Sequence, residues 1–156
     1  MIVEAQKVDA ERLCEIAVSA FIEDKKYRSD TVLVNGPPGH DNVDAHRQWM
    51  KGHHYVKYVR DSVIVAGCVV NFETECAEIH GLFVDSDMMN RGIGKELIQY
   101  LFERHPKIKT WQLETPDYAI RNQTFYENLG FICIQKTEVK ANLGFGFYKY
   151  RAQIDG

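Results

Sequence analysis

One stretch of the sequence constrains this chain more than any other: an apolar strand, a polar loop and two glycines that open a helix. The predicted strand is Cys76–Val84, the polar loop follows from Asp85, and Gly92 and Gly94 begin an apolar helical pattern. Glycines leave backbone N–H groups unshielded, and a helix N-terminus carries about half a positive charge. The stretch predicts an anion site suited to a diphosphate, although two glycines alone more often mark a plain turn into a helix.

Two familiar nucleotide-binding patterns do not fit this stretch. The dinucleotide pattern G-x-G-x-x-G requires a third glycine where the chain has Leu97. The P-loop requires four residues between its glycines and a Gly-Lys-Ser/Thr ending, whereas the chain reads Gly94-Lys95-Glu96. Both folds are therefore rejected as the origin of the anion site.

Length and charge narrow the class of protein. The 156 residues correspond to one domain, and the net charge of −3 offers no basic excess for a dedicated nucleic-acid binder. The longest apolar run, Val63–Val70, is far shorter than the ~20 residues of a membrane span. No signal-peptide pattern and no CxxC pair is present. We expect one domain over residues 1–156, cytoplasmic, with reduced cysteines and without nucleic-acid or membrane partners.

Hydrophobic periodicity predicts the order of the elements. Strands are expected over residues 2–7, 55–60, 62–72, 76–84, 110–114, 131–139 and 144–150, and helices over about 9–24, 43–50, 92–104 and 117–129. Asp9 and Asp117 are expected to cap the helices that they begin, with Val8 packed against Leu13. The resulting order, β α α β β β α β α β β, is typical of an α+β protein or a mixed sheet.

Two motifs in this order resemble those of a known family. Met89-Asn90-Arg91-Gly92-Ile93-Gly94 resembles motif A of the GNAT superfamily of acyl-CoA-dependent N-acyltransferases, Gln/Arg-x-x-Gly-x-Gly/Ala, although Met89 replaces the usual Gln or Arg. Phe125-Tyr126-Glu127-Asn128-Leu129-Gly130-Phe131 resembles motif B, with the core Phe-Tyr-Glu-x-Leu-Gly-Phe. The upstream half of motif B departs, since Ala119 and Asn122 stand where Asn and Ala are usual. On these motifs the chain is identified as a GNAT member.

The resemblance implies a fold and a cosubstrate. The expected fold is α+β, the GNAT fold, with a central mixed, largely antiparallel sheet of six to seven strands, splayed parallel strands in its middle and about four flanking helices. The cosubstrate is acetyl-CoA, whose pantetheine arm enters where a bulge at Gly81 parts those strands; no metal is implied. The residues expected to bind acetyl-CoA are Leu82, Phe83 and Val84 for the pantetheine, Met89, Asn90, Arg91, Gly92, Ile93, Gly94 and Lys95 around the pyrophosphate, and Asn122 and Tyr126.

Acetyl transfer to an amine needs a base for the amine, which titrates near pH 10, and an acid for the leaving thiolate. By resemblance, Glu78 occupies the position of the glutamate base of the histone acetyltransferases, and Glu114 that of the ribosomal-protein acetyltransferases. A solvent-facing strand carboxylate is the alternative reading of Glu78. His80, which shares its face, is either a proton relay or a packed residue. Tyr126 is the expected acid.

The expected function is an N-acetyltransferase that moves an acetyl group from acetyl-CoA to a primary amine by direct attack in a ternary complex. The alternative is a non-catalytic acyl-CoA-binding sensor or regulatory module of the same fold. By resemblance, the acceptor pocket is built from residues 27–55 and 143–148. We expect a monomer or homodimer. A cationic amine is favoured by the acidic residues near the site, which are Glu73, Glu75, Glu78, Glu114 and Asp117.

Overall fold

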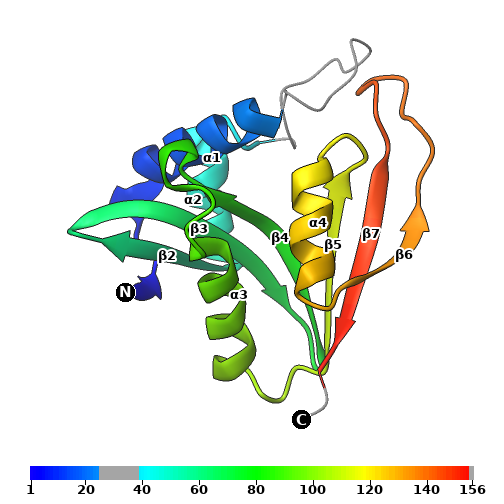
Figure 1. Ribbon diagram of the computed structural model, residues 1–156. Coiled ribbons are helices and arrows are strands. Elements are labelled where there is room, and N and C mark those ends of the chain that lie inside the picture. The colour runs from blue at the N-terminus through cyan, green and yellow to red at the C-terminus, as the bar shows by residue number, and fades with distance from the viewer. Residues whose placement is uncertain (25–38, 155–156) are drawn as a thin grey trace.

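The computed structural model describes residues 1–24 and 39–154. In these ranges strands and helices follow one another in the predicted order (Figure 1). The elements are β1 Ile2–Glu4, η1 Lys7–Asp9, α1 Ala10–Asp24, α2 Val43–Gly52, β2 His54–Arg60, β3 Val63–Phe72, β4 Cys76–Val84, η3 Ser86–Met88, α3 Ile93–Arg104, β5 Thr110–Pro116, α4 Ile120–Asn128, β6 Ile132–Lys136 and β7 Phe147–Gln153.

The described strands form one seven-stranded sheet in the order β1-β2-β3-β4-β5-β7-β6. Neighbouring strands are antiparallel except β4 and β5, which are parallel and lie in the middle. A parallel pair needs a long crossover connection, and the segment containing α3 supplies it. The predicted mixed, largely antiparallel sheet with a central parallel pair and flanking helices is confirmed.

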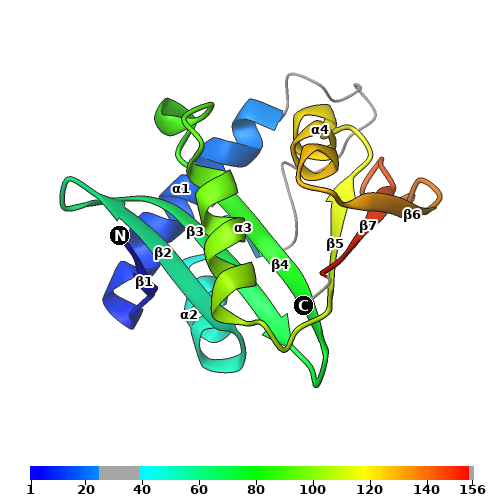
Figure 2. The same cartoon turned by 60° about the horizontal axis from the view of Figure 1, so that its bottom comes forward.

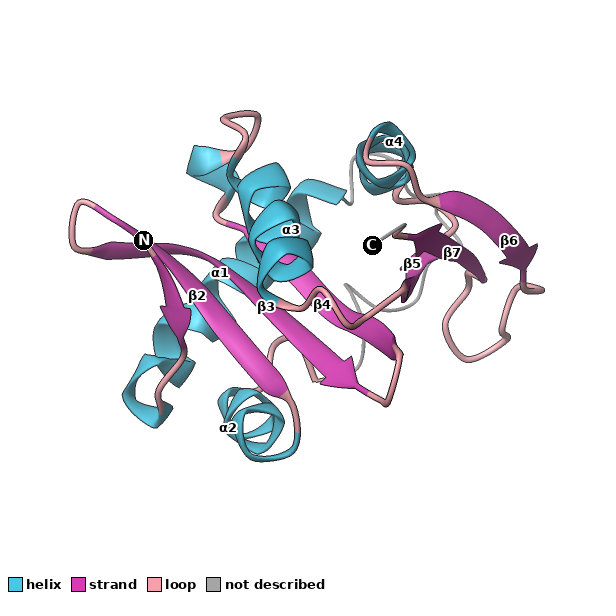
Figure 3. Cartoon of the chain, turned by 90° about the horizontal axis from the view of Figure 1, so that it is seen from below, coloured by secondary structure: helices cyan, strands magenta, loops and turns pink. Residues whose placement is uncertain are grey.

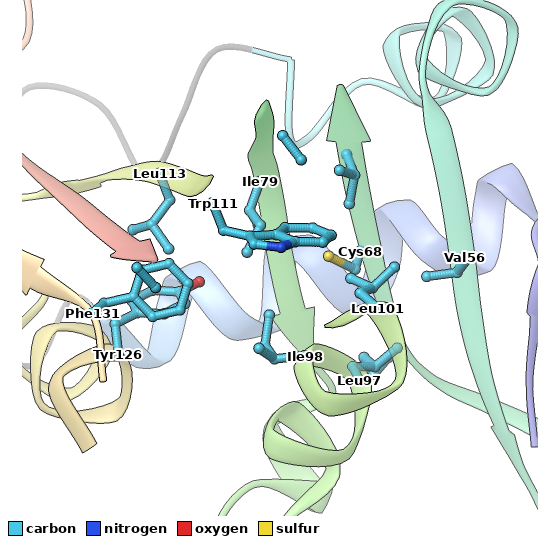
Figure 4. Packing of buried hydrophobic residues seen from close by; sticks show 14 of the residues in the cluster. Val56, Cys68, Ile79, Leu97, Ile98, Leu101, Trp111, Leu113, Tyr126 and Phe131 are labelled. Carbon is cyan, nitrogen blue, oxygen red and sulfur yellow. The ribbon is translucent and has the colours of Figure 1, made fainter. Parts of the chain in front are cut away.

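The helices lie on both faces of this sheet (Figures 2 and 3). Helices α1 and α2 pack against β2, β3 and β4 on one face, whereas α3 and α4 lie on the other. The α3 face holds the larger core, in which Trp111 of β5 lies above Leu97, Ile98 and Leu101 of α3 (Figure 4). This packing buries one side of α3 and leaves its N-terminal end free to form part of a site.

A β-bulge at His80 changes the course of β4. Ile79 and Gly81 pair with consecutive residues of β3, so His80 is an extra residue in β4. The pairing of β4 with β5 also ends here, because Ile79 and Leu113 form its last pair. Beyond this point the two parallel strands diverge, as Figure 1 shows toward the top of the view. The bulge expected near Gly81 is therefore confirmed, with His80 as the inserted residue.

The predicted start of the first helix is wrong in its details. Asp9 ends a 3-10 turn, and its Oδ2 accepts hydrogen bonds from the Gln6 backbone N–H at 2.8 Å and from Lys57 Nζ at 2.7 Å. Val8 is 85% exposed, so it makes no staple with Leu13. Asp9 instead ties the start of α1 to β2, a long-range contact that local capping rules do not anticipate.

The predicted cap of the last helix is also wrong, because α4 begins at Ile120 and Asp117 lies three residues earlier. The Asp117 carboxylate accepts a hydrogen bond from the Gly146 backbone N–H at 2.9 Å. It thereby joins the end of β5 to the segment before β7, which begins at Phe147 and not at residue 144.

None of the described helices is long and apolar enough to cross a membrane. Within the described ranges, no three His, Cys, Asp or Glu side chains are grouped so as to hold a metal ion. The four cysteines all lie in these ranges and are free thiols.

Candidate functional site

A cavity of about 690 Å³ lies beside the point where β4 and β5 diverge. Its walls come from the end of α1, the second half of β4, the loop and first turn of α3, and α4. Every residue predicted to bind acetyl-CoA lines it except Arg91, which is exposed and lies outside the lining. The tertiary structure thus brings motif A and motif B, some 30 residues apart in the sequence, to opposite walls of one cavity.

The first turn of α3 presents backbone N–H groups at this cavity. Gly92 is its N-cap, with a left-handed φ of 79°, and no side chain caps the helix. The first N–H groups of a helix have no partner within it, and the helix dipole adds positive partial charge. A Cβ at Gly92 would meet no atom within 4 Å, so the space in front of the turn is open. Uncapped donors beside open space fit the pyrophosphate of a coenzyme A molecule.

The two glycines serve different purposes. Gly92 is required by its positive φ, which side chains rarely adopt. Gly94 is favoured by packing, because a Cβ there would lie only 3.0 Å from Cζ of Phe125 in α4 and the ring would have to shift slightly. The motif-A glycine at position 94 therefore lets α3 and α4 approach each other across the cavity, which spacing alone does not indicate.

Tyr126 projects from α4 into the same region. Its ring lies with Leu113 and Phe131, and its hydroxyl points toward β4 (Figure 4). Burial, with smaller contributions from Cys68 and Asp24, raises the pKa of this phenol above its ordinary value. The hydroxyl has no hydrogen-bond partner among the described residues, although Tyr126 lines the cavity. Tyr126 therefore stays protonated at neutral pH and is a free donor toward a ligand there.

Asp24, the last residue of α1, is a part of this cavity that the sequence interpretation missed. Its side chain is buried, with 3% of the residue exposed. The carboxylate accepts hydrogen bonds from Arg121 Nη2 at 3.3 Å and from Asn122 Nδ2 at 3.4 Å, both on α4. Burial raises its pKa to about 6 despite the opposing effect of Arg121. The signal in the sequence was an acidic residue on the apolar face of the first helix, four residues after Ala20.

Replacing Asp24 by Asn is expected to stabilise the folded chain above pH 6. The folded carboxyl keeps its proton up to about pH 6, whereas an unfolded one with the ordinary value of 3.8 releases it earlier. The folded state thus binds more protons between these values, and stability falls as pH rises through this window. The shift corresponds to at most about 3 kcal/mol in the free energy of unfolding. Thermal unfolding of both proteins from pH 4 to pH 8 measures it.

The two unfolding curves should coincide near pH 4, where both side chains are neutral, and separate above pH 6. An Asp24→Asn variant that is less stable than the parent at pH 8 would show that the bond to Arg121 outweighs the cost of burial.

The predicted bases lie on the opposite face of the sheet from Tyr126. Glu78 and Glu114 alternate with Ile79 and Leu113, which point into the α3 core, so the two carboxylates point away from it. Both are exposed, and Glu114 forms an ion pair with Lys149 at 3.5 Å. Neither lines the cavity. The two faces meet at the gap between β4 and β5.

His80 sits at this gap. Its ring stacks on His53 at a centroid distance of 5.2 Å and meets the edge of Trp49 at 5.3 Å. Burial, followed by the charge of His53, lowers the pKa of His80, while Glu78 acts in the opposite direction. His80 is therefore neutral at pH 7, which is compatible with both the relay and the packing interpretation.

The region expected to form the acceptor pocket is described only in part, since residues 27–38 lie outside the described ranges. Of its histidines, His46 is fully buried and serves the core: Nδ1 lies 2.8 Å from the Tyr55 hydroxyl and Nε2 2.7 Å from the His40 carbonyl. Phe145 is buried against Tyr118. These residues shape the region by packing.

Comparison with known proteins agrees with this geometry. The model of the acetyltransferase (GNAT) family matches residues 12–131, so the chain belongs to that family. No curated protein sequence matches it. Similar solved structures include the PaiA N-acetyltransferase of Thermoplasma acidophilum in complex with coenzyme A, with a TM-score of 0.79 and 14% identity over 99% of this chain and 98% of that one.

Two further structures show the same fold. The ribosomal-protein-alanine N-acetyltransferase of Brucella melitensis has a TM-score of 0.74 and 18% identity, covering 99% of each chain. An aminoglycoside 6'-acetyltransferase type Ii has a TM-score of 0.75 and 18% identity, covering 100% of this chain and 98% of its own. At these identities the likeness concerns the fold.

Proposed function

We propose that this protein transfers an acetyl group from acetyl-CoA to a primary amine by direct attack in a ternary complex. The observation that carries the proposal is the arrangement around the divergence of β4 and β5. A cavity with uncapped helix donors and a protonated tyrosine lies on one face, and two carboxylates lie on the other. A thioester in the gap would be reached by an amine from the carboxylate face.

In this proposal, acetyl-CoA binds mainly through the backbone. The N–H groups from Asn90 to Lys95 hold the pyrophosphate, and the strand edge at Leu82–Val84, left unpaired by the divergence, bonds the pantetheine as an added strand would. Asn122 reaches the arm from α4. A net charge of −3 does not oppose this, because local donors and Lys95 supply the positive potential.

The reaction then needs two proton transfers. Glu78 accepts the proton of the ammonium group, and the free amine nitrogen attacks the thioester carbonyl carbon. The carbon–sulfur bond breaks, and Tyr126 donates its proton to the leaving sulfur. Positioning of the two substrates supplies much of the rate, and each proton transfer contributes about 10²- to 10⁴-fold.

Replacing Glu78 by Gln is expected to lower kcat/KM for the amine about 100-fold, because it removes the base. Glu114→Gln is the matched comparison and should have a smaller effect, since Lys149 already binds that carboxylate. Steady-state release of the CoA thiol with saturating acetyl-CoA measures both. A larger loss of kcat/KM in Glu114→Gln than in Glu78→Gln would show that Glu114, and not Glu78, is the base.

Release of the CoA thiol across a panel of primary amines tests the function itself. Thiol release that depends on an amine, with an acetylated product of the expected mass, supports the transferase. Tight coenzyme A binding without release for any amine, and without an effect of Glu78→Gln or Tyr126→Phe, would identify the non-catalytic sensor instead.

A further inference from the structure

The face of the sheet that carries Glu78 also carries a positive charge, that of Arg151. Residues that pair across neighbouring strands lie side by side on one face, and Glu78 pairs with Gln112, which pairs with Arg151. Trp111, Leu113, Tyr150 and Ala152, which alternate with these residues, all belong to the opposite core. Glu78, Gln112 and Arg151 therefore form one row across β4, β5 and β7.

The described helices on this face pack over β2, β3 and β4 and leave β5 and β7 uncovered by a helix (Figure 3). The next row along β5 and β7 holds Glu114 and Lys149, whose ion pair neutralises both charges in part. A guanidinium and a carboxylate, Arg151 and Glu78, then remain on the same face of the sheet. Their backbones are roughly 10 Å apart, which is two strand spacings.

Arg151 is incompletely satisfied in this arrangement. Its Nε is shielded from solvent and has no hydrogen-bond partner in the part of the chain that the structure describes. The side chain makes no ion pair or hydrogen bond with any residue of the described ranges. A shielded donor without an acceptor is costly. The two terminal Nη groups are not shielded in this way, and they can bind a carboxylate through two parallel hydrogen bonds. Arg151 is thus equipped to receive an anionic group from outside the chain.

This balance refines the expectation of a cationic amine as the acceptor. That expectation rested on five acidic residues. Of these, Asp117 accepts a hydrogen bond from the Gly146 N–H, and Glu114 forms an ion pair with Lys149. Glu73 and Glu75 precede β4, at the end of the sheet away from the divergence. Glu78 remains as an acid without an ion pair among the described residues, on the face that Arg151 shares.

We infer that the acceptor is a primary amine that also carries a carboxylate, that is, an amino acid, held with its ammonium group toward Glu78 and its carboxylate on Arg151. The inference rests on the proposed acetyl transfer and names the substrate class of that site. Arg151 acts here as a specificity-determining residue, and the transfer step remains as written above.

The test compares acceptors that differ only in the carboxylate. Suitable sets are L-lysine, lysinamide and cadaverine, and 4-aminobutyrate with its amide. The parent protein should use the carboxylate-bearing member of a set at least about 10-fold better in kcat/KM. Arg151→Gln should lower kcat/KM for that member about 10- to 100-fold and leave the amide unchanged. Arg104→Gln, at an exposed position in the last turn of α3, is the matched control and should leave the preference for the carboxylate intact.

Two further measurements keep the outcome decisive. The affinity for 4-aminobutyrate, measured by calorimetry in the presence of coenzyme A, should fall in Arg151→Gln, while the affinity for coenzyme A stays unchanged. Arg151→Lys keeps the charge but not the two-point geometry, so its affinity for 4-aminobutyrate should lie between those of the parent and Arg151→Gln. Equal use of acids and amides, or an equal loss for both in Arg151→Gln, would overturn the inference and leave the transferase standing. Absence of thiol release with every amine would overturn the transferase and the inference together.

Discussion

Replacing Gly92 by Asp is expected to weaken acetyl-CoA binding at least about 100-fold. The N-cap position has open space in front of it, so the new carboxylate would fit without a clash and would face the proposed pyrophosphate site. Two like charges about 4 Å apart repel by about 4 kcal/mol near a protein surface, which exceeds the cost of the stated loss. Isothermal titration with coenzyme A measures the dissociation constant directly, without any acceptor.

The matched control is Gly92→Asn. Asn has the shape of Asp without its charge, and it is among the residues that best tolerate a positive φ; Asn90 in this same loop already has a φ of 64°. Gly92→Asn should therefore lose much less affinity, and its binding should be less sensitive to salt. Equal affinities in the two variants would show that the backbone conformation and not phosphate binding explains this glycine.

Replacing Tyr126 by Phe is expected to lower kcat about 100-fold with little change in coenzyme A affinity. The ring packs in the α3 core and would remain, while the hydroxyl, which has no partner among the described residues, would be lost. Because burial raises the pKa of this phenol, the hydroxyl is protonated throughout the usable pH range and acts as a donor. The missing step in the variant is donation to the leaving sulfur.

Three measurements separate this role from packing. The unfolding temperature of Tyr126→Phe should stay close to that of the parent, because the hydroxyl makes no hydrogen bond with any residue that the structure describes. The loss should shrink with thioesters whose leaving thiol has a lower pKa, since such a thiolate needs no proton to depart. Tyr100→Phe, on half-buried α3 surface, should retain full activity. A variant that loses affinity but keeps kcat would remove the acid role of Tyr126.

Local signals were strong enough to predict the elements around the cavity. The strand Cys76–Val84 was predicted with its observed bounds, and the helix after Gly92 within one residue. Their signals are short-range: apolar runs, glycines and a proline two residues after the helix. Asp9 and Asp117 were assigned wrongly because local rules predict each as a helix cap. In the structure, the carboxylate of Asp9 instead binds Lys57, and that of Asp117 binds Gly146, both far away in the sequence. A partner that lies far away in the sequence cannot be found from the residues next to the carboxylate.

The sequence by itself determined the order of the elements, because backbone conformation and hydrophobic periodicity depend on near neighbours. The resemblance of its two motifs to those of the GNAT family then indicated the fold and the motif residues. Only the tertiary structure decided how these residues meet. It placed Asp24 against Arg121 and Asn122, nearly a hundred residues away, and Gly94 against Phe125. It also set Glu78 and Arg151 in one row, because strand order and register, which no local pattern encodes, decide which side chains share a face.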